Sequence, residues 1–247
     1  MQELEACDLP RESLRKLVKS LRTTITCLSS LLEKMNTLGR TILPAWASAK
    51  SAKTNTNSHN PPIWGTYIRW MALCPEAWRV VIDGRIPLTL STPTIVEECG
   101  KKQHESLLVA VTRNLEKLPG TQVVKHYKIK YSVKINDEWR DLVVKPDAYK
   151  IWITSRGPVN LVVEATTRSK KMIPREWLTS YNLGLYLQNL RPTFTLLVTP
   201  EEVGILPLST RDVEKLKNLL YRPPKIKPTP WLCSNCDLRS VCGNPLA

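Results

Sequence analysis

The sequence lacks any apolar run near the roughly 20 residues that a membrane-spanning helix requires. A signal-peptide pattern at Met1 is also missing, and together these absences predict a cytoplasmic protein with no membrane span. Acidic residues are scarce: 22 Asp and Glu stand against 36 Lys and Arg, for a formal net charge of +14. Such an excess favours nucleic acid as a partner, because each neutralised phosphate releases condensed counterions. The alternatives are an anionic membrane surface, or lysines that simply solvate the protein.

The first 43 residues are predicted to form a separate amphipathic helical segment. Apolar residues recur there at alternating spacings of four and three, which places them along one helix face: Leu14, Val18, Leu21, Ile25, Leu28, Leu32 and Met35. The favoured interpretation is a helix packed on the main domain. The alternative is that residues 12–38 pair with a partner protein or a second copy of the chain.

Residues 44–62 are rich in small and polar side chains and are predicted to be a linker to a main domain over residues 63–247. In that domain we expect helices at 64–84, 94–118, 174–190 and 209–221, and strands at 123–135, 139–153, 159–166 and 193–199. The segment VNLVVEAT is nearly all apolar and β-branched, as is typical of a buried central strand. The order predicts an α/β fold whose mixed central sheet spans about residues 121–199.

Seven cysteines are present, and three of them form a C-x2-C-x5-C pattern near the end of the sequence: Cys233, Cys236 and Cys242. In a reducing compartment, clustered cysteines are better interpreted as metal ligands than as disulfides. Three thiolates need a fourth ligand, and the set suits a tetrahedral zinc or a four-iron cluster equally well. Cys74 is the favoured fourth ligand because it follows an apolar helical stretch that Pro75 interrupts. The competing candidates are Cys7, Cys27 and Cys99.

Two carboxylates and a histidine follow one another along the middle of the chain. His104 lies in a predicted helix, Asp147 follows Pro146 at a strand end, and Glu164 lies in the buried strand. A carboxylate in an apolar strand is costly unless it is paired or binds a cation. Two carboxylates and an imidazole can hold Mg²⁺ or Mn²⁺ and a water against a phosphodiester. Each residue alone has a simpler structural interpretation, but their order beside a cysteine tail favours the metal site.

The ordered motifs resemble those of RecB-like nucleases of the PD-(D/E)xK superfamily. They are G-x-x-x-H ending at His104, PD at Asp147, an apolar-E at Glu164 and Y-x-x-x-L starting at Tyr186. The CP at Cys74 and the terminal cysteine pattern are similar to the iron–sulfur branch, as in CRISPR-associated exonucleases of spacer acquisition. Within this branch, the sequence most resembles the archaeal Csa-one-like subfamily. The resemblance covers about residues 65–245 and excludes the N-terminal helix.

The resemblance implies a restriction-endonuclease-like core with a helical iron–sulfur subdomain built from elements near 65–90 and 231–247. The ligands of a catalytic Mg²⁺ or Mn²⁺ would be His104, Asp147, Glu164 and the backbone carbonyl of Ala165. The ligands of a [4Fe–4S] cluster that pins the tail would be Cys74, Cys233, Cys236 and Cys242. Asn182 and Tyr186 would stand for the family's Q-x-x-x-Y pair in the catalytic site.

Two positions depart from the family pattern. The E-x-K lysine falls at Thr166, which carries no charge and shares the strand face of Glu164. Lys150, Lys170 or Lys171 could reach in from another backbone position. Asn182 keeps the amide of the family's glutamine but is one methylene shorter.

Three functions follow from these observations. The first is a metal-dependent DNA exonuclease that acts on single-stranded ends or overhangs during CRISPR spacer acquisition. The second is a catalytically weakened DNA-binding scaffold, joined to the CRISPR adaptation proteins through the N-terminal helix. The third is a zinc-ribbon protein that binds nucleic acid and whose acidic residues are incidental. Three tryptophans before the predicted cluster either stack on single-stranded bases or belong to the core: Trp64, Trp70 and Trp78.

Overall fold

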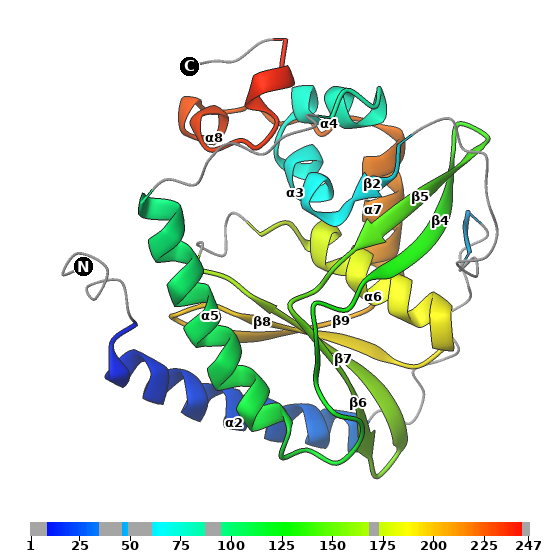
Figure 1. Ribbon diagram of the computed structural model, residues 1–247. Coiled ribbons are helices and arrows are strands. Elements are labelled where there is room, and N and C mark those ends of the chain that lie inside the picture. The colour runs from blue at the N-terminus through cyan, green and yellow to red at the C-terminus, as the bar shows by residue number, and fades with distance from the viewer. Residues whose placement is uncertain (1–8, 35–45, 49–60, 87–94, 168–172, 244–247) are drawn as a thin grey trace.

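The computed structural model describes residues 9–34, 46–48, 61–86, 95–167 and 173–243, and it shows two β-sheets with helices on and between them (Figure 1). The helices are α2 (Arg11–Lys34), α3 (Gly65–Leu73), α4 (Pro75–Ile82), α5 (Ile95–Leu115), α6 (Arg175–Asn189), α7 (Thr210–Tyr221), α8 (Pro230–Ser234) and the 3-10 turn η2 (Arg239–Val241). The strands are β1 (Ala47–Ser48), β2 (Ile63–Trp64), β3 (Val124–Lys125), β4 (Ile129–Ile135), β5 (Glu138–Val144), β6 (Ala148–Thr154), β7 (Gly157–Ala165), β8 (Thr193–Val198) and β9 (Val203–Pro207).

The larger sheet is mixed and has the strand order β3-β6-β7-β8-β9. Strand β7 is antiparallel to β6 and parallel to β8, and helix α6 makes the crossover between β7 and β8. The smaller sheet has the order β1-β4-β5-β2 around the β4–β5 hairpin. Its turn residues Asn136 and Asp137 have φ of 49° and 65°, as two-residue hairpin turns require. The α/β class with a mixed sheet is therefore confirmed.

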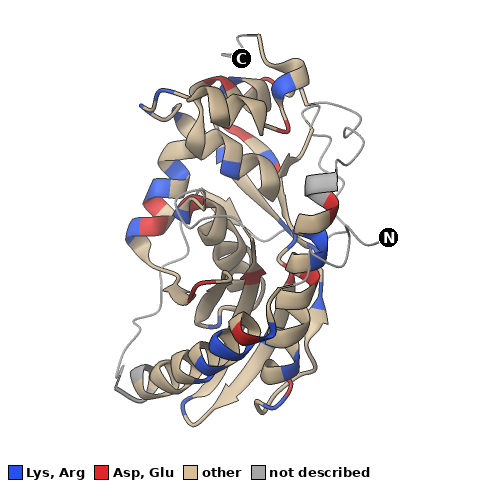
Figure 2. Ribbon diagram, turned by 90° about the vertical axis from the view of Figure 1, so that its left-hand side faces the viewer, with Lys and Arg blue, Asp and Glu red and all other residues tan. Residues whose placement is uncertain are grey.

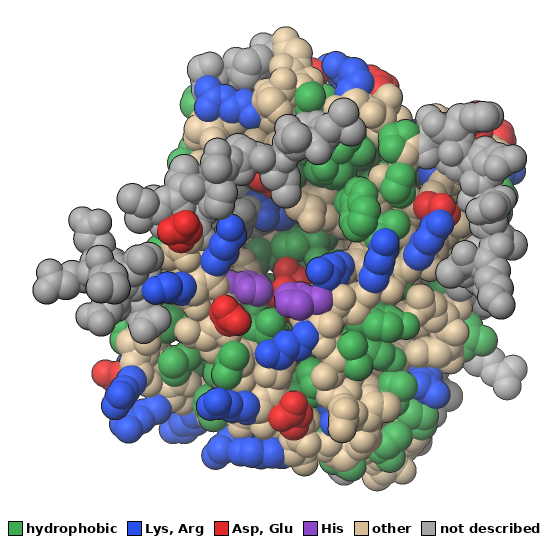
Figure 3. Space-filling view, in the orientation of Figure 1, with side chains coloured by type: hydrophobic (Ala, Val, Ile, Leu, Met, Phe, Trp, Pro, Cys, Tyr) green, Lys and Arg blue, Asp and Glu red, His purple; other side chains and the backbone are tan. Residues whose placement is uncertain are grey.

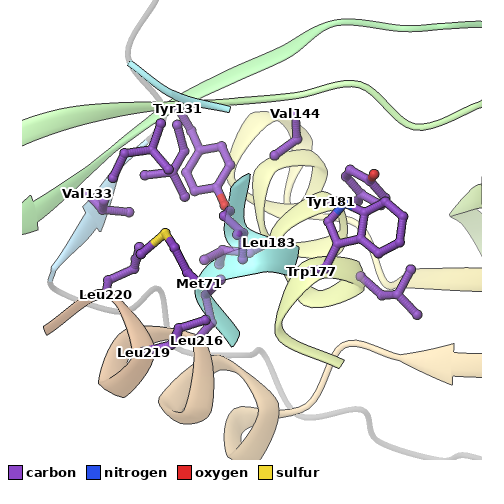
Figure 4. Close-up of a cluster of buried hydrophobic side chains, with 14 of the residues drawn as sticks. Met71, Tyr131, Val133, Val144, Trp177, Tyr181, Leu183, Leu216, Leu219 and Leu220 are labelled. Atoms are coloured by element: carbon purple, nitrogen blue, oxygen red, sulfur yellow. The ribbon is translucent and has the colours of Figure 1, made fainter. Parts of the chain in front are cut away.

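Helix α6 lies between the two sheets and is buried from Trp177 to Leu187. The helix contacts β4 and β5 on one side and β7 and β8 on the other. Gly184 permits this close approach, since a Cβ there would stand 2.7 Å from Ile129 Cγ2 and 2.9 Å from the Tyr131 ring. The core on this side also takes in α3, α4 and α7, and Figure 4 shows Met71 beside the leucines of α7.

The opposite face of the large sheet is covered by α2 and α5, which lie along it in Figure 1. The buried residues of α2 are Leu17, Leu21, Ile25, Leu28 and Leu32, and the helix contacts α5 and β9. The N-terminal helix thus packs on the domain, as favoured from the sequence. Its buried face includes Leu17 and is rotated away from Leu14 and Val18, which are only partly buried. Met35 lies outside the described residues.

Three segments differ from the predicted elements. Residues 123–135 are not one strand, since His126 has a φ of 53° and separates β3 in one sheet from β4 in the other. Residues 139–153 divide at Asp147 into β5 and β6, which also belong to different sheets. Within the predicted linker, β1 pairs with β4 and Trp46 is 7% exposed. Alternating side chains predict a strand but not the sheet that it joins.

Lys and Arg are spread over many elements rather than confined to one (Figure 2). Across the described ranges, no helix combines the length and apolar character needed to cross a bilayer.

We predict that Gly184→Ala destabilises the protein by about 1–3 kcal/mol, because its methyl group overlaps side chains of a packed core. This loss opposes the gain of about 1 kcal/mol that alanine offers in a helix. The matched control is Gly204→Ala in β9, where a Cβ meets nothing within 4 Å and the change stays within about 0.5 kcal/mol. Urea denaturation of both variants tests this, and equal midpoints would show that α6 and β4 are not in tight contact.

Candidate functional site

Asp147 lies where the chain passes from the small sheet to the large one, between β5 and β6. Its Oδ2 accepts a hydrogen bond from the backbone N–H of Ala165, at 2.8 Å. Its carbonyl accepts from the backbone N–H of His126, at 2.9 Å. The first bond holds the carboxylate at the end of β7, and the second fixes the backbone of Asp147.

His104 extends the buried stripe of α5 beyond the edge of the sheet. The stripe consists of Leu107, Leu108, Val111 and Leu115, at helical spacing from the histidine. The Nε2 atom of His104 lies 3.0 Å from Asp147 Oδ2, and the imidazole also donates to the Ala165 carbonyl. The hydrogen bond to Asp147 raises the pKa of His104 above its ordinary value, although burial acts in the opposite direction.

Glu164 is the next-to-last residue of β7 and is only 6% exposed. Its Oε2 is buried and has no hydrogen-bond partner. Burial, and then the charge of Asp147, raise the pKa of Glu164 well above its ordinary value. A hydrogen bond from the Tyr181 hydroxyl acts the other way and favours the carboxylate. The glutamate is therefore a buried acid that repels its neighbouring aspartate.

The four ligands expected from the sequence are neighbours: His104 and the Ala165 backbone bond to Asp147 and to each other, and the charge of Asp147 acts on Glu164. In Figure 3, histidine side chains lie at a hollow in the middle of the visible face, with an acidic side chain beside them and basic side chains around. Within the described parts of the chain, no three His, Cys, Asp or Glu side chains approach closely enough to hold one metal ion. A cation here would therefore require rearrangement, and His104 would exchange Asp147 for the ion.

The donor set nevertheless suits a hard divalent cation, which prefers oxygen ligands such as carboxylates and carbonyls. The unpartnered Glu164 Oε2 is a buried acceptor without a donor, and such a group needs an explanation. A cation would satisfy this oxygen and would offset the repulsion between Glu164 and Asp147.

The side-chain amide of Asn182 bonds to strands of the large sheet and not to these carboxylates. Asn182 accepts from Thr195 Oγ1 at 2.7 Å and donates to the Leu206 carbonyl at 3.2 Å, so its amide joins α6 to β8 and β9. Tyr186 is a buried member of the core between the sheets. The residue that bonds Glu164 is Tyr181, which sequence reasoning missed.

A signal for Tyr181 was present in the sequence. The pair Trp177 and Tyr181 has the same four-residue spacing as Asn182 and Tyr186, slightly earlier along α6. Figure 4 shows Trp177 and Tyr181 side by side, with ring centroids 5.9 Å apart in an edge-on arrangement. Asn182 looked like the catalytic residue because it is polar, but its amide joins α6 to β8 and β9.

Neither Thr166 nor Lys150 supplies a positive charge beside Glu164. Thr166 is 7% exposed, and its backbone N–H donates to the Val198 carbonyl. Lys150 lies on the other face of the sheet, opposite Leu161, and its Nζ donates to the Thr121 carbonyl at 2.6 Å. Burial lowers the pKa of Lys150. Residues 170 and 171 lie outside the described residues.

Four cysteines line a second site, a small pocket that is partly open to solvent: Cys74, Cys233, Cys236 and Cys242. We call these residues the cysteine cradle. Cys27 is exposed on α2, and Cys99 lies on α5, so neither lines this cavity. Cys7 is outside the described residues. Among the candidates for the fourth position that the structure describes, Cys74 is the one that lines this pocket.

Backbone hydrogen bonds and burial act in opposite directions on the thiols of the cradle. Cys74 caps α4, and backbone hydrogen bonds from Glu76 and Ala77 favour its charged form. Burial has a larger effect and raises the pKa of Cys74. Burial likewise raises the pKa of Cys236 to about 11. A metal that binds these sulfurs must displace their protons, so binding is favoured by rising pH.

A continuous set of contacts runs from the cradle to Glu164. Asp237, which follows Cys236, accepts from Trp70 Nε1 at 2.8 Å. The guanidinium of Arg69 lies 4.5 Å from the Trp70 ring centroid and 5.6 Å from that of Trp177. Trp177 in turn packs against Tyr181, the hydrogen-bond donor to Glu164. Arg69 is 4% exposed, and its Nε and Nη2 have no hydrogen-bond partner.

No protein-family model matches the chain, and no curated protein matches it. Among solved structures, the chain resembles one called "Crystal structure of SSO0001", with a TM-score of 0.44 and 14% sequence identity. The match covers 75% of this chain and 87% of the other. So distant a likeness carries no argument, and the function depends on the residues described above.

We predict that Glu164→Gln raises the free energy of unfolding of the metal-free protein by about 1–3 kcal/mol at pH 8, because a buried charge is removed. The folded state raises the pKa of Glu164, so wild-type stability falls as the pH rises from the unfolded-state pKa to the folded-state pKa. The advantage of the variant therefore shrinks on acidification, as the wild-type glutamate becomes neutral in both states. Thermal melts across pH measure this difference.

The matched control for these melts is Glu116→Gln, an exposed glutamate just after the end of α5. Addition of Mn²⁺ at a hundredfold excess over its dissociation constant stabilises the wild type and the control by about 2.7 kcal/mol. The same addition leaves Glu164→Gln nearly unchanged. Parallel pH profiles for all three proteins would contradict the burial of a charged Glu164.

Proposed function

We propose that the protein is a metal-dependent nuclease that cleaves DNA at single-stranded ends or overhangs. The observation that carries the proposal is the buried Oε2 of Glu164, which has no hydrogen-bond partner. Asp147 acts electrostatically on this glutamate, and His104 bonds to both Asp147 and the Ala165 carbonyl. The net charge of +14 supports a polyanionic substrate. The order of motifs, which resembles that of the RecB-like nucleases, supports a phosphodiester as the bond attacked.

Each residue of the site has a definable part in such a reaction. Asp147 is fixed by the Ala165 N–H, and Glu164 is oriented by the Tyr181 hydroxyl, so both carboxylates are positioned before substrate arrives. When bound, Mg²⁺ or Mn²⁺ would lower the pKa of a water and stabilise charge on the phosphate. His104 would have to give up a proton to bind an ion in place of Asp147, so metal affinity should rise with pH.

We further propose that the cysteine cradle holds a [4Fe–4S] cluster. Its four cysteines line one pocket, as the ligands of a single metal group must. A four-iron cluster is ligated at its corners by four thiolates. The similarity to the iron–sulfur branch of the family points the same way. The cluster would join the C-terminal tail to α3 and α4.

A role in CRISPR spacer acquisition is part of the proposal and depends on the family resemblance alone. Partner proteins of an adaptation complex are expected on the same basis. The apolar face of α2 is covered by the domain, so such partners would have to use other surfaces of this helix.

The second candidate function is a DNA-binding scaffold with weak or no catalysis. It is favoured by Thr166, which brings no positive charge beside Glu164, and by Lys150, which is turned to the opposite face of the sheet. A nuclease assay separates the two functions.

We predict that the wild-type protein degrades end-labelled DNA when Mn²⁺ is present, and that Asp147→Asn and Glu164→Gln each lower the rate more than about 100-fold. Loss of groups that merely support metal ligands already costs 10- to 100-fold. The control is Glu116→Gln, an exposed residue just after the end of α5, which should cut at the wild-type rate. Both carboxylate variants cutting like the wild type would show that the site is wrongly assigned, and an inactive wild type that binds DNA would favour the scaffold.

We predict that Cys74→Ser, purified anaerobically, loses most of its bound iron and sulfide together with its brown colour. The control is Cys27→Ser, which removes an exposed thiol on α2 and should leave the metal content unchanged. Metal analysis measures both outcomes. A colourless wild type with one zinc per chain would replace the cluster with a zinc site, and full iron content in Cys74→Ser would remove Cys74 from the ligands.

A further inference from the structure

An exposed aromatic and lysine surface lies beside the candidate metal site. Trp64 is 41% exposed, and the Nζ of Lys128 lies 5.3 Å from its ring centroid. Next to Lys128, the ring of Tyr127 stacks on Tyr149, with centroids 5.3 Å apart and an interplanar angle of 26°. We call the surface formed by Trp64, Tyr127 and Lys128 the Trp64 shelf.

The structure separates Trp64 from the other two tryptophans considered for base stacking. Trp70 is fully buried and donates its indole N–H to Asp237. Trp78 is partly buried in the core and donates to the Leu219 carbonyl. Trp64 alone among these three presents a large part of its ring to solvent. A single exposed tryptophan is ordinary on a protein surface, so its surroundings must supply the rest.

The pairing of strands places the Trp64 shelf next to Asp147. Strand β2 runs parallel to β5 with Trp64 opposite Val143, four residues before Asp147. On the other side of β5, Ile129 lies opposite Val144, so Lys128 also lies at this end of the sheet. The backbone N–H of His126 donates to the Asp147 carbonyl. Trp64 is thus connected to Asp147 through β5, and Lys128 through both β5 and the backbone bond of His126.

The charge around this end of the sheet is positive. Lys125, Lys128 and Lys145 are all exposed, and none of them forms an ion pair with a carboxylate of the described residues. Lys125 lies opposite Ala148, next to Asp147, and Lys145 precedes Asp147 by two residues. Basic and apolar side chains surround the hollow that holds the histidines in Figure 3.

We propose that the Trp64 shelf binds a single strand of nucleic acid and leads it to Asp147 and Glu164. One base stacks on the Trp64 ring, and the ammonium of Lys128, displaced from that ring, contacts a neighbouring phosphate. Lys125 and Lys145 neutralise phosphates nearer the carboxylates. This inference rests on the proposed nuclease site and adds to it the residues that select the substrate.

The chemistry of the shelf favours a single strand over a duplex. A base can stack on an indole only when it has left its own stack, and this interaction tolerates any base because every base has a π-face. An aromatic ring flanked by lysines suits this alternation of flat bases and charged phosphates. A protein partner would also use an exposed tryptophan, and its binding is one outcome of the test below.

The test is a binding titration of the full-length protein with fluorescein-labelled oligothymidylate, in chelator and without divalent metal, so that binding is measured without cleavage. Trp64→Ala should weaken binding about 5- to 150-fold, which corresponds to the about 1–3 kcal/mol of one base–aromatic stack. Lys128→Gln should weaken it and lower the salt slope by about one. A blunt duplex of equal length should lose much less affinity in Trp64→Ala.

The β4–β5 hairpin supplies a matched control at its other end. Trp139 is 36% exposed and lies opposite Lys134 near the turn, so the variants Trp139→Ala and Lys134→Gln remove the same side chains away from Asp147. These variants should bind like the wild type. Thermal melts confirm that all four variants are folded. Equal weakening by Trp139→Ala and Trp64→Ala, or unchanged binding in Trp64→Ala, would contradict the proposal that the shelf binds single-stranded nucleic acid.

Cleavage assays on the same variants separate this inference from the nuclease proposal. If both are right, Trp64→Ala raises KM for single-stranded DNA while kcat at saturation changes little. If Trp64→Ala cuts with wild-type KM, the role of the shelf in substrate binding is wrong, while the proposed nuclease function is supported. If Trp64→Ala loses binding while the wild type shows no turnover with Mn²⁺, single-strand binding by the shelf is supported and the nuclease function is wrong. A partner protein that binds through Trp64 without any effect of Trp64→Ala on oligothymidylate also overturns the proposal.

Discussion

The site depends on one buried carboxylate whose oxygen has no partner. Glu164 lies at the end of the central strand, where its charge is removed from water and repelled by Asp147. An apolar residue at this position would be more stable, so the stability of the fold does not explain the glutamate. The surrounding elements converge on it: β7 positions it, the Ala165 N–H fixes Asp147, and Tyr181 on α6 donates to it.

The cysteine cradle and the carboxylate site are parts of one packed structure. The side chains of Asp237, Trp70, Arg69, Trp177 and Tyr181 form successive contacts between the tail and Glu164. The buried Arg69 is held by two indole rings, with two nitrogens unsatisfied, which gives this path little tolerance for displacement. Binding of a metal group by the tail would therefore stabilise the same helices that orient the carboxylate.

The sequence named side chains that lie near one another in both places, but not all of those that support them. His104, Asp147 and Glu164 came from their order along the chain, and Cys74 from its place before a proline. Asp147 was expected at a strand end, but alternation could not show that β5 and β6 join different sheets. Tyr181 was missed because two pairs at the same spacing lie on α6, and the polar Asn182 was the more conspicuous. Burial, which separates Trp64 from Trp70, is a property of the fold that helical spacing alone does not determine.

The most direct measurement is anomalous diffraction from crystals soaked in Mn²⁺, with data collected at the manganese and iron edges. The account predicts a manganese peak within ligand distance of Asp147, Glu164 and the Ala165 carbonyl, with His104 turned from Asp147 towards it. It also predicts a separate iron peak among the four cysteines. Manganese bound elsewhere, with Glu164 Oε2 still unpartnered in the occupied crystal, would contradict the account.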